Sequence, residues 1–367
     1  MRTVASNPQD SMVDVVVIGA GQAGLSAAFY LQKSGLEPND GFVVLDQSER
    51  PGGAWQHRWP SLTLETVNGV SDLPGLKFSD VVPVEQSSVH ASDAVPRYYE
   101  AFEEKFDLRV QRPVSVSVVC GGEERFRVET DRGIYWARGL INATGTWEKP
   151  FIPYYPGIDT FRGRQLHTKD YNTADEFRGK HTIVVGGGIS AVQLIDEISR
   201  VTSTTWVTRS EPVFRDAPFD PELGRRAVAL VEDRVRRGLP PGSVVSVTGI
   251  PVTEQVRDAR SRGVLDRKPA FARIEPDGVR WKDGTFERAD IIFWCTGFRS
   301  SLDHLAPLGL RGQGGGITMS GRLATQVAAN PRVHLIGYGP SASTIGANRA
   351  GRAAVKELLA TIDGVNP

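Results

Sequence analysis

The chain has 367 residues, which is long enough for two or three domains with cores of their own. Basic and acidic residues number 43 each, so the net charge gives no reason to expect nucleic acid or an anionic membrane as a partner. No apolar run approaches the ~20 residues of a membrane span, and the N-terminus lacks the apolar stretch of a signal peptide.

Cysteine and histidine usage narrows the class of protein further. Cys120 and Cys295 are the two cysteines, and their separation indicates a cytoplasmic chain without a disulfide framework. The six histidines show no metal-ligand spacing, so we predict no metal site. Residues 1–11 are expected to form a flexible tail.

The first patterned element is a short apolar strand at residues 15–18, followed by the turn Gly19-Ala-Gly21-Gln-Ala-Gly24 and a helix. In such a turn the first glycine permits the tight bend, the second lets the backbone approach a pyrophosphate, and the third lets the helix pack on the strand. The helix N-terminus then presents free N–H groups to the phosphates. Asp46 ends the next strand, where its carboxylate can accept both hydroxyls of a ribose. The contacts predicted for this dinucleotide are Gly19, Gly21, Gln22, Ala23, Gly24, Asp46 and Gln47.

A helix is expected next, at about residues 96–106. After it, alternating apolar residues over 114–136 predict a small antiparallel meander. The chain then returns through an apolar strand at 139–142 to Ala143-Thr144-Gly145.

The second half of the chain repeats this plan. A strand at 182–185 leads into Gly186-Gly-Gly188-Ile-Ser-Ala191 and a helix, and a later meander has tight turns at Asp277-Gly278 and Asp283-Gly284. The strand at 290–295 runs into Thr296-Gly297, as the earlier strand runs into Thr144-Gly145. Two such turns predict two dinucleotides, with FAD at the first and a nicotinamide nucleotide at the second. The predicted contacts of the second are Gly186, Gly188, Ile189, Ser190, Ala191, Thr296 and Gly297.

The repeat predicts an α/β fold of two three-layer, Rossmann-like FAD/NAD(P)-binding domains, with the second inserted in the first. We expect residues 12–155 and 291–367 to form the FAD-binding domain and residues 156–290 the NADP-binding domain. The arginine-rich stretch 215–265 is poorly patterned. It is expected to form helices and loops over the nicotinamide domain, either as a solvated surface or as a lid.

The residues after the strand at 205–208 bear on the choice of nicotinamide nucleotide. The acid typical of NAD sites is absent there, and Arg209 and Ser210 stand in its place. An arginine can bind a 2′-phosphate through two charge-assisted hydrogen bonds. This pattern favours NADPH, although Glu211 weakens the preference and leaves NADH possible.

Five elements in this order give the chain its resemblance to a known family. They are the first glycine turn, Gly52-Gly53-Ala54-Trp55, the FxGxxxHxxxY pattern of Phe161, Gly163, His167 and Tyr171, the second glycine turn, and Thr296-Gly297. The chain resembles the small, bacterial-type flavin-containing monooxygenases, which belong to the class B flavoprotein monooxygenases. The related Baeyer–Villiger enzymes end the same pattern in Trp and are usually longer.

This resemblance implies that NADPH reduces FAD, that O₂ then forms a C4a-(hydro)peroxyflavin, and that this species oxygenates an amine nitrogen or a sulfide sulfur. The partners implied are a small organic substrate and O₂, with a homodimer possible. Two alternatives stay open: Baeyer–Villiger oxygenation of ketones, and a flavin reductase or oxidase that uses NAD(P)H without a dithiol.

The resemblance also assigns roles to single residues. Gly53, Ala54 and Trp55 would wrap the flavin, and Asn68 would be the catalytic amide near C4a, although Asn-Gly is also an ordinary turn signal. Further FAD contacts are expected at Val114, through its backbone, and at Ala143, Thr144 and Gly145.

The four residues of the FxGxxxHxxxY pattern would hold the interdomain linker and couple NADPH binding to domain orientation. A proton-transfer role for His167 is the alternative. The stretch 341–346 could cap a helix whose N-terminus points at the flavin, so that the helix dipole favours the anionic reduced ring.

Overall fold

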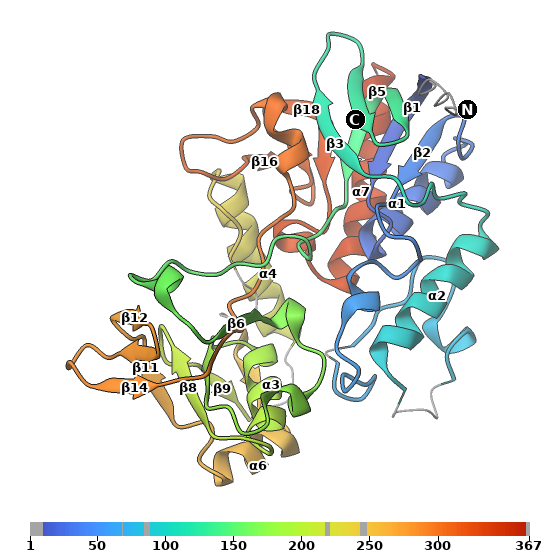
Figure 1. The fold of residues 1–367 in the computed structure, drawn as a ribbon. Coiled ribbons are helices and arrows are strands. Elements are labelled where there is room, and N and C mark those ends of the chain that lie inside the picture. Colours follow the sequence, from blue (N-terminus) through green and yellow to red (C-terminus); the bar gives the residue numbers. More distant parts are fainter. Residues whose placement is uncertain (1–9, 68, 84–88, 217–220, 243–247, 365–367) are drawn as a thin grey trace, which may run out of the picture.

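The computed structural model describes residues 10–67, 69–83, 89–216, 221–242 and 248–364. Two sheets dominate this part of the chain, and each is covered on both faces (Figure 1). The larger sheet has the order β16-β17-β18-β5-β1-β2, and β3 and β4 join it through the β4–β5 pairing. Its strands are β1 (Ser11–Ile18), β2 (Phe42–Leu45), β3 (Val116–Cys120), β4 (Phe126–Thr130), β5 (Gly133–Asn142), β16 (Met319–Ser320), β17 (Gln326–Val327) and β18 (Asn330–Leu335).

Alternation along β1 explains the three layers of the larger unit. Val15 and Val17 pack into a core shared with the helices, whereas Val16 and Ile18 pack into a second core shared with the β3–β4 meander. The helices α1 and α7 lie side by side on their face of the sheet (Figure 1). The helices of this unit are α1 (Gln22–Lys33), α2 (Ala91–Lys105) and α7 (Thr344–Ile362).

The strand β5 pairs with strands on both of its sides. The sequence pattern predicts its two halves as separate elements, the end of a meander and a return strand. Its first half pairs antiparallel with β4, from Gly133 to Ala137, while the strand also runs parallel to β1 along most of its length. The predicted meander over 114–136 is confirmed by the β3–β4 and β4–β5 pairings. The single long strand therefore joins the meander to the parallel sheet.

The smaller sheet repeats the plan with the order β11-β8-β7-β15-β6. One face packs on α3 and α6, and the other packs on a three-stranded antiparallel sheet, β12-β13-β14, whose turns are the two predicted Asp-Gly turns. The elements are β6 (Arg164–His167), β7 (Thr182–Val185), α3 (Ile189–Ile198), β8 (Thr204–Thr208), α6 (Glu254–Ser261), β11 (Arg267–Pro269), β12 (Arg273–Glu275), β13 (Gly278–Arg280), β14 (Phe286–Arg288) and β15 (Ile291–Trp294).

The fold class is that of the prediction: a three-layer FAD/NAD(P)-binding fold whose second sheet is built from chain that lies between β5 and β16. One expected boundary differs from the strand pairing. The expected boundary at residue 291 assigns β15 to the FAD-binding domain, whereas this strand pairs with β7 and β6 inside the smaller sheet. In the repeat, β15 is the counterpart of β5, so the chain leaves the smaller sheet only after Cys295. With that change, the division into domains stays a proposal.

The chain crosses between the two units twice, and the two crossing segments run side by side. Pro150 on the outgoing crossing and Phe298 on the returning crossing form an antiparallel bridge. Backbone bonds on either side of it join Arg299 N to the carbonyl of Lys149 at 2.7 Å and Phe151 N to the carbonyl of Gly297 at 2.9 Å. The crossings therefore form one ladder at the junction.

Two expected element boundaries differ from the structure. The helix α2 begins at Ala91, before the expected start near Pro96, so this proline lies inside it. The strand β1 begins at Ser11, inside the expected 1–11 tail, and residues 1–9 lie outside the described residues.

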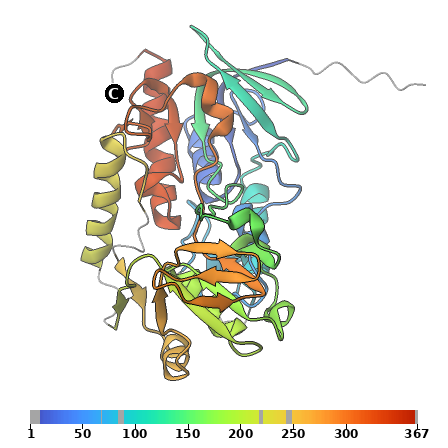
Figure 2. The same ribbon diagram turned by 60° about the vertical axis from the view of Figure 1, so that its left-hand side comes forward.

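The stretch 215–265 does not lie only over the smaller unit. The helix α4 (Pro221–Arg236) packs on the larger one, where Val235 is buried in the core shared with the meander, and Figure 2 shows α4 alongside α7. Short elements complete the described chain: β9 (Phe214–Arg215), β10 (Ile250–Pro251), and the 3₁₀ helices η1 (Gly53–His57), η2 (Phe78–Asp80), η3 (Ile158–Thr160), η4 (Thr168–Asp170), η5 (Ala174–Phe177), η6 (Asp303–Leu308) and η7 (Gly339–Ser341).

Candidate functional site

The three glycines of the first turn occupy three different environments. Gly19 has a φ of +99°, and a Cβ there would lie 2.7 Å from the carbonyl oxygen of Ala143. A Cβ on Gly24 would lie 1.8 Å from the carbonyl oxygen of Gly19, so only glycine lets α1 approach the strand this closely. Gly21 has no atom within 4 Å of such a Cβ. The turn is thus packed at its two ends and open at its middle, where a pyrophosphate would approach the backbone.

Asp46 lies at the carboxyl end of β2 and is buried. Its Oδ2 accepts from Ala20 N at 2.6 Å and its Oδ1 from Ser48 N at 2.8 Å, so the carboxylate is fixed against the turn. Behind it, Arg112 makes a two-pronged ion pair with Glu103 at 2.5 and 2.7 Å. Burial raises the pKa of Glu103, and the bonds from Arg112 oppose that rise. Both oxygens of Asp46 retain lone pairs for further donors.

A single cavity brings most of the predicted flavin-site residues together. It also takes in residues with no place in the prediction, among them His57, Tyr99, Trp147 and His304. The predicted residues along its wall are Gly19, Gly21, Gln22, Ala23, Asp46, Gln47, Gly53, Ala54, Trp55, Val114, Ala143, Thr144 and Gly145.

The N-terminus of α7 also opens onto this cavity. Ser343 is its N-cap and accepts a hydrogen bond from Gly346 N at 3.0 Å, so the expected cap is present. Ser343, Thr344 and Ala347 all line the cavity. The positive end of a 19-residue helix therefore faces the space where a bound group would lie.

Two predicted cofactor contacts have groups that are already engaged. The side chain of Gln22 accepts from Tyr99 Oη at 2.7 Å and donates to Asn348 Oδ1 at 3.0 Å, so it connects α1 to α2 and α7. The N–H of Val114 donates to the carbonyl of Asp46 at 2.8 Å. This leaves the backbone of Gln22 and the carbonyl of Val114 for a ligand.

The second turn reproduces the geometry of the first. Gly186 has a φ of +146°, and a Cβ there would lie 2.2 Å from the carbonyl oxygen of Cys295. Gly188 is the N-cap of α3 and has no atom within 4 Å of such a Cβ. Ala191, in place of the third glycine, is fully buried. The first helical residues of α3 are Ile189 and Ser190.

The region after β8 contains a second arginine that the sequence did not single out. Arg209 and Ser210 follow β8 directly and are exposed. Arg267 reaches the same end of the strand from β11 and donates to Thr208 Oγ1 at 3.3 Å. Among the described residues, neither arginine forms an ion pair. Nothing in the sequence around Arg267 indicates this placement, because it depends on the pairing of β11 with β8.

The residues after β15 hold the junction rather than stand free. The carbonyl of Gly297 accepts from Phe151 N at 2.9 Å and lies 2.9 Å from His167 Nε2. His167 Nδ1 accepts from Lys169 N at 3.1 Å, so Nε2 must be the protonated nitrogen that donates to Gly297. Thr296 Oγ1 donates to the carbonyl of Phe151.

The hydrogen bonds of His167 bear on its two proposed roles. Burial lowers the pKa of the ring, so the neutral form is favoured. Both ring nitrogens are occupied by backbone groups of the junction. This arrangement favours a positioning role over proton transfer.

Phe161 and Gly163 lie at the start of β6, away from either turn. A Cβ on Gly163 would lie 2.5 Å from the ring of Phe161 and 2.4 Å from the carbonyl oxygen of Asp290. Phe161 packs on the core between the smaller sheet and its antiparallel cover. The FxG half of the pattern therefore anchors an edge strand, because only glycine leaves room for the aromatic ring.

Tyr171 belongs to a polar contact between the two units. Its hydroxyl donates to Glu197 Oε2 at 2.8 Å, and Ser61 Oγ lies 2.8 and 2.9 Å from the two oxygens of the same carboxylate. One helical turn away, Gln193 Nε2 donates to the carbonyl of Thr66 at 3.1 Å. Glu197 carries no sequence signal because its partners lie 26 and 136 residues away.

The 58–66 loop makes this contact apolar as well as polar. It follows η1, which contains Trp55, and so begins beside the first cavity. Its residues Trp59 and Leu62 are buried in the core that α3 forms with Tyr171. The loop therefore connects the wall of the first cavity to the helix that begins at the second turn.

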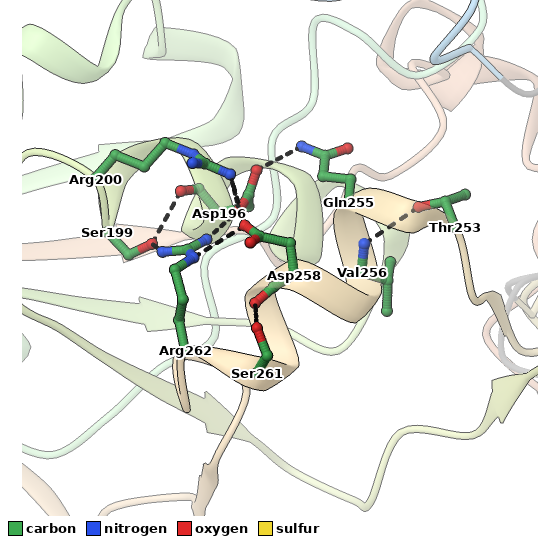
Figure 3. A network of polar contacts seen from close by, with 9 residues as sticks. All are labelled: Asp196, Ser199, Arg200, Thr253, Gln255, Val256, Asp258, Ser261 and Arg262. Carbon is green, nitrogen blue, oxygen red and sulfur yellow. Dashed lines mark hydrogen bonds and ion pairs between the residues drawn. The ribbon is translucent and has the colours of Figure 1, made fainter.

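A separate network fixes α6 to α3 (Figure 3). The carboxylate of Asp196 is almost fully buried and accepts from Gln255 at 2.8 Å, from Arg200 at 3.0 Å and from Arg262. Asp258 on α6 accepts from both arginines, at 2.8 and 3.0 Å. These bonds compensate the cost of burying the charge of Asp196 and fix α6 to α3, the helix that begins at the second turn.

Asn68 lies outside the described residues, so its predicted catalytic placement stays a prediction. In the described ranges no group of three or more His, Cys, Asp or Glu side chains could hold a metal ion. None of the helices described is both long and apolar enough to cross a membrane.

Comparison with known proteins places this architecture. The model of the pyridine nucleotide-disulphide oxidoreductase family matches residues 16–319. The structure of a flavin-containing monooxygenase from Stenotrophomonas maltophilia superposes with a TM-score of 0.81 and is 39% identical, covering 96% of this chain and 99% of that one.

Two curated relatives are more distant in sequence. The uncharacterized oxidoreductase CzcO of Bacillus velezensis is 27% identical over 79% of this chain and 83% of its own length. The indole-3-pyruvate monooxygenase YUCCA1 of Oryza sativa is 28% identical over 78% of this chain and 77% of its own length.

Proposed function

Because this chain belongs to the pyridine nucleotide-disulphide oxidoreductase family and is a flavin-containing monooxygenase, we propose that it uses FAD and NADPH to oxygenate a soft nucleophile, an amine nitrogen or a sulfide sulfur. NADPH, a proton, O₂ and the substrate would give NADP⁺, water and the oxygenated product. The observation that carries the proposal is the pair of matched turns, 19–24 and 186–191, each open at its middle glycine. When bound, FAD supplies the redox chemistry by taking a hydride from the nicotinamide and passing two electrons to O₂.

The residues around the first cavity fit FAD. Gly21 leaves room for a pyrophosphate, and Asp46 faces the cavity with lone pairs for ribose hydroxyls. The N-terminus of α7 would stabilise negative charge on the reduced ring. Trp55, on η1, would cover part of that ring and keep water from it.

The two thiols support a mechanism without a dithiol. Cys120 and Cys295 are both free, and burial raises the pKa of Cys295 to about 12, so this thiol is not a nucleophile at neutral pH. Electrons would therefore pass from the nicotinamide to the flavin and on to O₂ without a protein disulfide.

The guanidinium groups beyond β8 support NADPH as the donor. We expect Arg209→Ala to lower kcat/KM for NADPH by about 10- to 100-fold, since each charge-assisted hydrogen bond to the 2′-phosphate contributes ~1.5–3 kcal/mol. The kcat/KM for NADH, which lacks that phosphate, should change little. Steady-state kinetics with both nucleotides measures the ratio.

Arg273→Ala is the control, because this arginine is exposed on β12 and pairs with Glu275. Unchanged NADPH/NADH selectivity in Arg209→Ala would remove this assignment. In that event Arg267→Ala would show whether the neighbouring guanidinium binds the phosphate instead.

The contact between the 58–66 loop and α3 would couple the two sites. We expect Tyr171→Phe to slow flavin reduction by NADPH about tenfold, since it removes one hydrogen bond to the carboxylate of Glu197. FAD affinity should not change, because Tyr171 does not line the first cavity. Anaerobic stopped-flow reduction measures the rate, and fluorescence titration measures the affinity.

Tyr154→Phe is a matched control, since this tyrosine is 79% exposed on the same linker. A reduction rate in Tyr171→Phe equal to that of the control would show that the contact is structural only. Glu197→Gln should resemble Tyr171→Phe, because a neutral amide accepts a weaker bond than a carboxylate.

The decisive experiment follows the oxygen atom. The purified yellow protein is supplied with NADPH, ¹⁸O₂ and methyl phenyl sulfide, and the product is analysed by mass spectrometry. One labelled oxygen in the sulfoxide, with equal amounts of NADPH consumed and sulfoxide formed, would support the proposal. A labelled lactone from a cyclic ketone, without sulfoxide, would favour Baeyer–Villiger chemistry. Hydrogen peroxide as the main product with every substrate would identify an oxidase.

On the family resemblance, we propose Asn68 as the catalytic amide near the flavin C4a. Asn68→Asp keeps the size of the side chain but replaces the amide donor with an acceptor. Comparing oxygenation with peroxide release in this variant tests that role.

A further inference from the structure

His304 lines the first cavity, although no sequence pattern marks it. It lies on η6, a few residues after the returning crossing, and is half-buried. Its Nε2 lies 2.7 Å from Asn142 Oδ1, at the carboxyl end of β5. The side chain therefore lies against the central strand of the larger sheet with one face toward the cavity.

A chain of hydrogen bonds determines which nitrogen of His304 carries the proton. Thr144 Oγ1 lies 2.6 Å from the carbonyl of Ser301, which can only accept, so the hydroxyl donates to it. Asn142 Nδ2 must then donate to Thr144 Oγ1, at 3.0 Å. The amide oxygen of Asn142 consequently faces His304, whose Nε2 donates to it.

The other ring nitrogen, Nδ1, is left with a lone pair. Burial lowers the pKa of His304 to about 4, so the ring is neutral at physiological pH. In the described part of the chain, Nδ1 has no hydrogen-bond partner. This atom is not fully buried, so a ligand can reach it. Nδ1 is thus an accessible hydrogen-bond acceptor on a side chain that lines the cavity.

The surroundings of η6 indicate which end of the cavity this acceptor reaches. Val114 is tied to Asp46 by a backbone hydrogen bond, so the chain entering β3 lies beside the carboxylate expected to hold the adenosine ribose. Leu302 and Leu305, which flank His304, share a core with Val114, and η6 packs on β3. His304 therefore lies at the adenosine end of the cavity.

We propose that His304 Nδ1 accepts a hydrogen bond from the exocyclic amino group of the FAD adenine, which makes His304 a specificity residue for the cofactor. Adenine offers one donor group on its edge, the amino group, and a neutral imidazole nitrogen is its complement. The N–H of Val114 is already used, so its backbone offers a ligand only the carbonyl, and His304 Nδ1 is a side-chain acceptor at the same end of the cavity. The inference rests on the proposal that the cavity holds FAD.

The test is a cycle that changes His304 and the adenine amino group independently. Apoprotein is titrated with FAD and with a synthetic analogue that has purine in place of adenine, and the Kd of each is measured from flavin fluorescence. The wild type should bind the purine analogue about tenfold more weakly, the effect of one hydrogen bond. His304→Phe should bind both flavins with equal affinity.

The ratio of the two Kd values is insensitive to any general loosening of the site, because such a change affects both flavins alike. His304→Ala gives the same cycle without the ring if the phenylalanine variant does not fold. A tenfold ratio that persists in the variants, or equal affinities in the wild type, would overturn the role of His304 alone. Failure of the wild type to bind either flavin would overturn the FAD proposal, and this inference with it.

Discussion

A Gly188→Ala enzyme should keep its flavin but lose its reduction by NADPH. The glycine has a φ of −102°, which alanine adopts without strain, and its Cβ would meet no atom within 4 Å. The added methyl group would instead occupy the space in which a pyrophosphate meets the N-terminus of α3. Loss of two charge-assisted hydrogen bonds at ~1.5–3 kcal/mol each predicts at least a hundredfold rise in the Kd of the nucleotide.

The measurement separates binding from chemistry. Anaerobic reduction by NADPH should become slow and non-saturating, whereas dithionite should still reduce the flavin. Gly187→Ala is the matched control, because its Cβ would make ordinary contacts at 3.6 Å with Pro212 and Thr208. Wild-type reduction kinetics in Gly188→Ala would show that the second turn does not bind the nucleotide.

At the first turn, Gly21→Ala should yield a folded but colourless protein. Gly21 has a φ of −79° and no neighbour within 4 Å of an added Cβ, so the apoprotein accommodates the change. The methyl group would displace the FAD pyrophosphate and raise the Kd for FAD at least a hundredfold, by the same loss of backbone hydrogen bonds. Flavin content after purification and FAD titration of the apoprotein measure the effect.

Gly24→Ala provides the contrast within the same turn. Its Cβ would lie 1.8 Å from the carbonyl oxygen of Gly19, so this variant should lose thermal stability even as apoprotein. An apo melting temperature in Gly21→Ala as low as that of Gly24→Ala would show that Gly21 has a packing role, and our assignment would be wrong.

The sequence predicts what is dictated locally. Glycine spacing determines both turns because each position has one steric requirement, and the side-chain alternation of the meander determines which face is buried. The repeat of strand, turn and helix then predicts the insertion of one unit in the other. Each turn and each alternating strand is contained in a short segment of sequence, so no knowledge of tertiary contacts is required to recognise it or its repeat.

What the sequence does not predict depends on docking between distant segments. The pairing of β11 with β8, which brings Arg267 beside Arg209, has no local signal. The poorly patterned stretch 215–265 likewise does not indicate which unit α4 packs on, because its contact with the larger unit depends on the tertiary fold.

Single polar residues are hardest to predict, because their role follows from their partners. In the sequence, Glu197 does not differ from the other acidic residues. Its partners Ser61 and Tyr171 are brought to it only by the fold. His304 likewise belongs to no motif, and its tautomer follows from a chain of three side chains and one carbonyl.

The ladder between the two crossings has a consequence for the history of this protein. Because Pro150 and Phe298 face each other across one bridge, the entire smaller unit occupies the position of a loop at the tip of a hairpin. A single insertion event at that tip would convert an ancestral one-nucleotide protein into a two-nucleotide one without breaking any strand of the host sheet. The reverse change would replace residues 151–297 with a short turn. All eight strands of the larger sheet would remain in the shortened protein. The helix α4 and its buried Val235 would be lost with the removed segment.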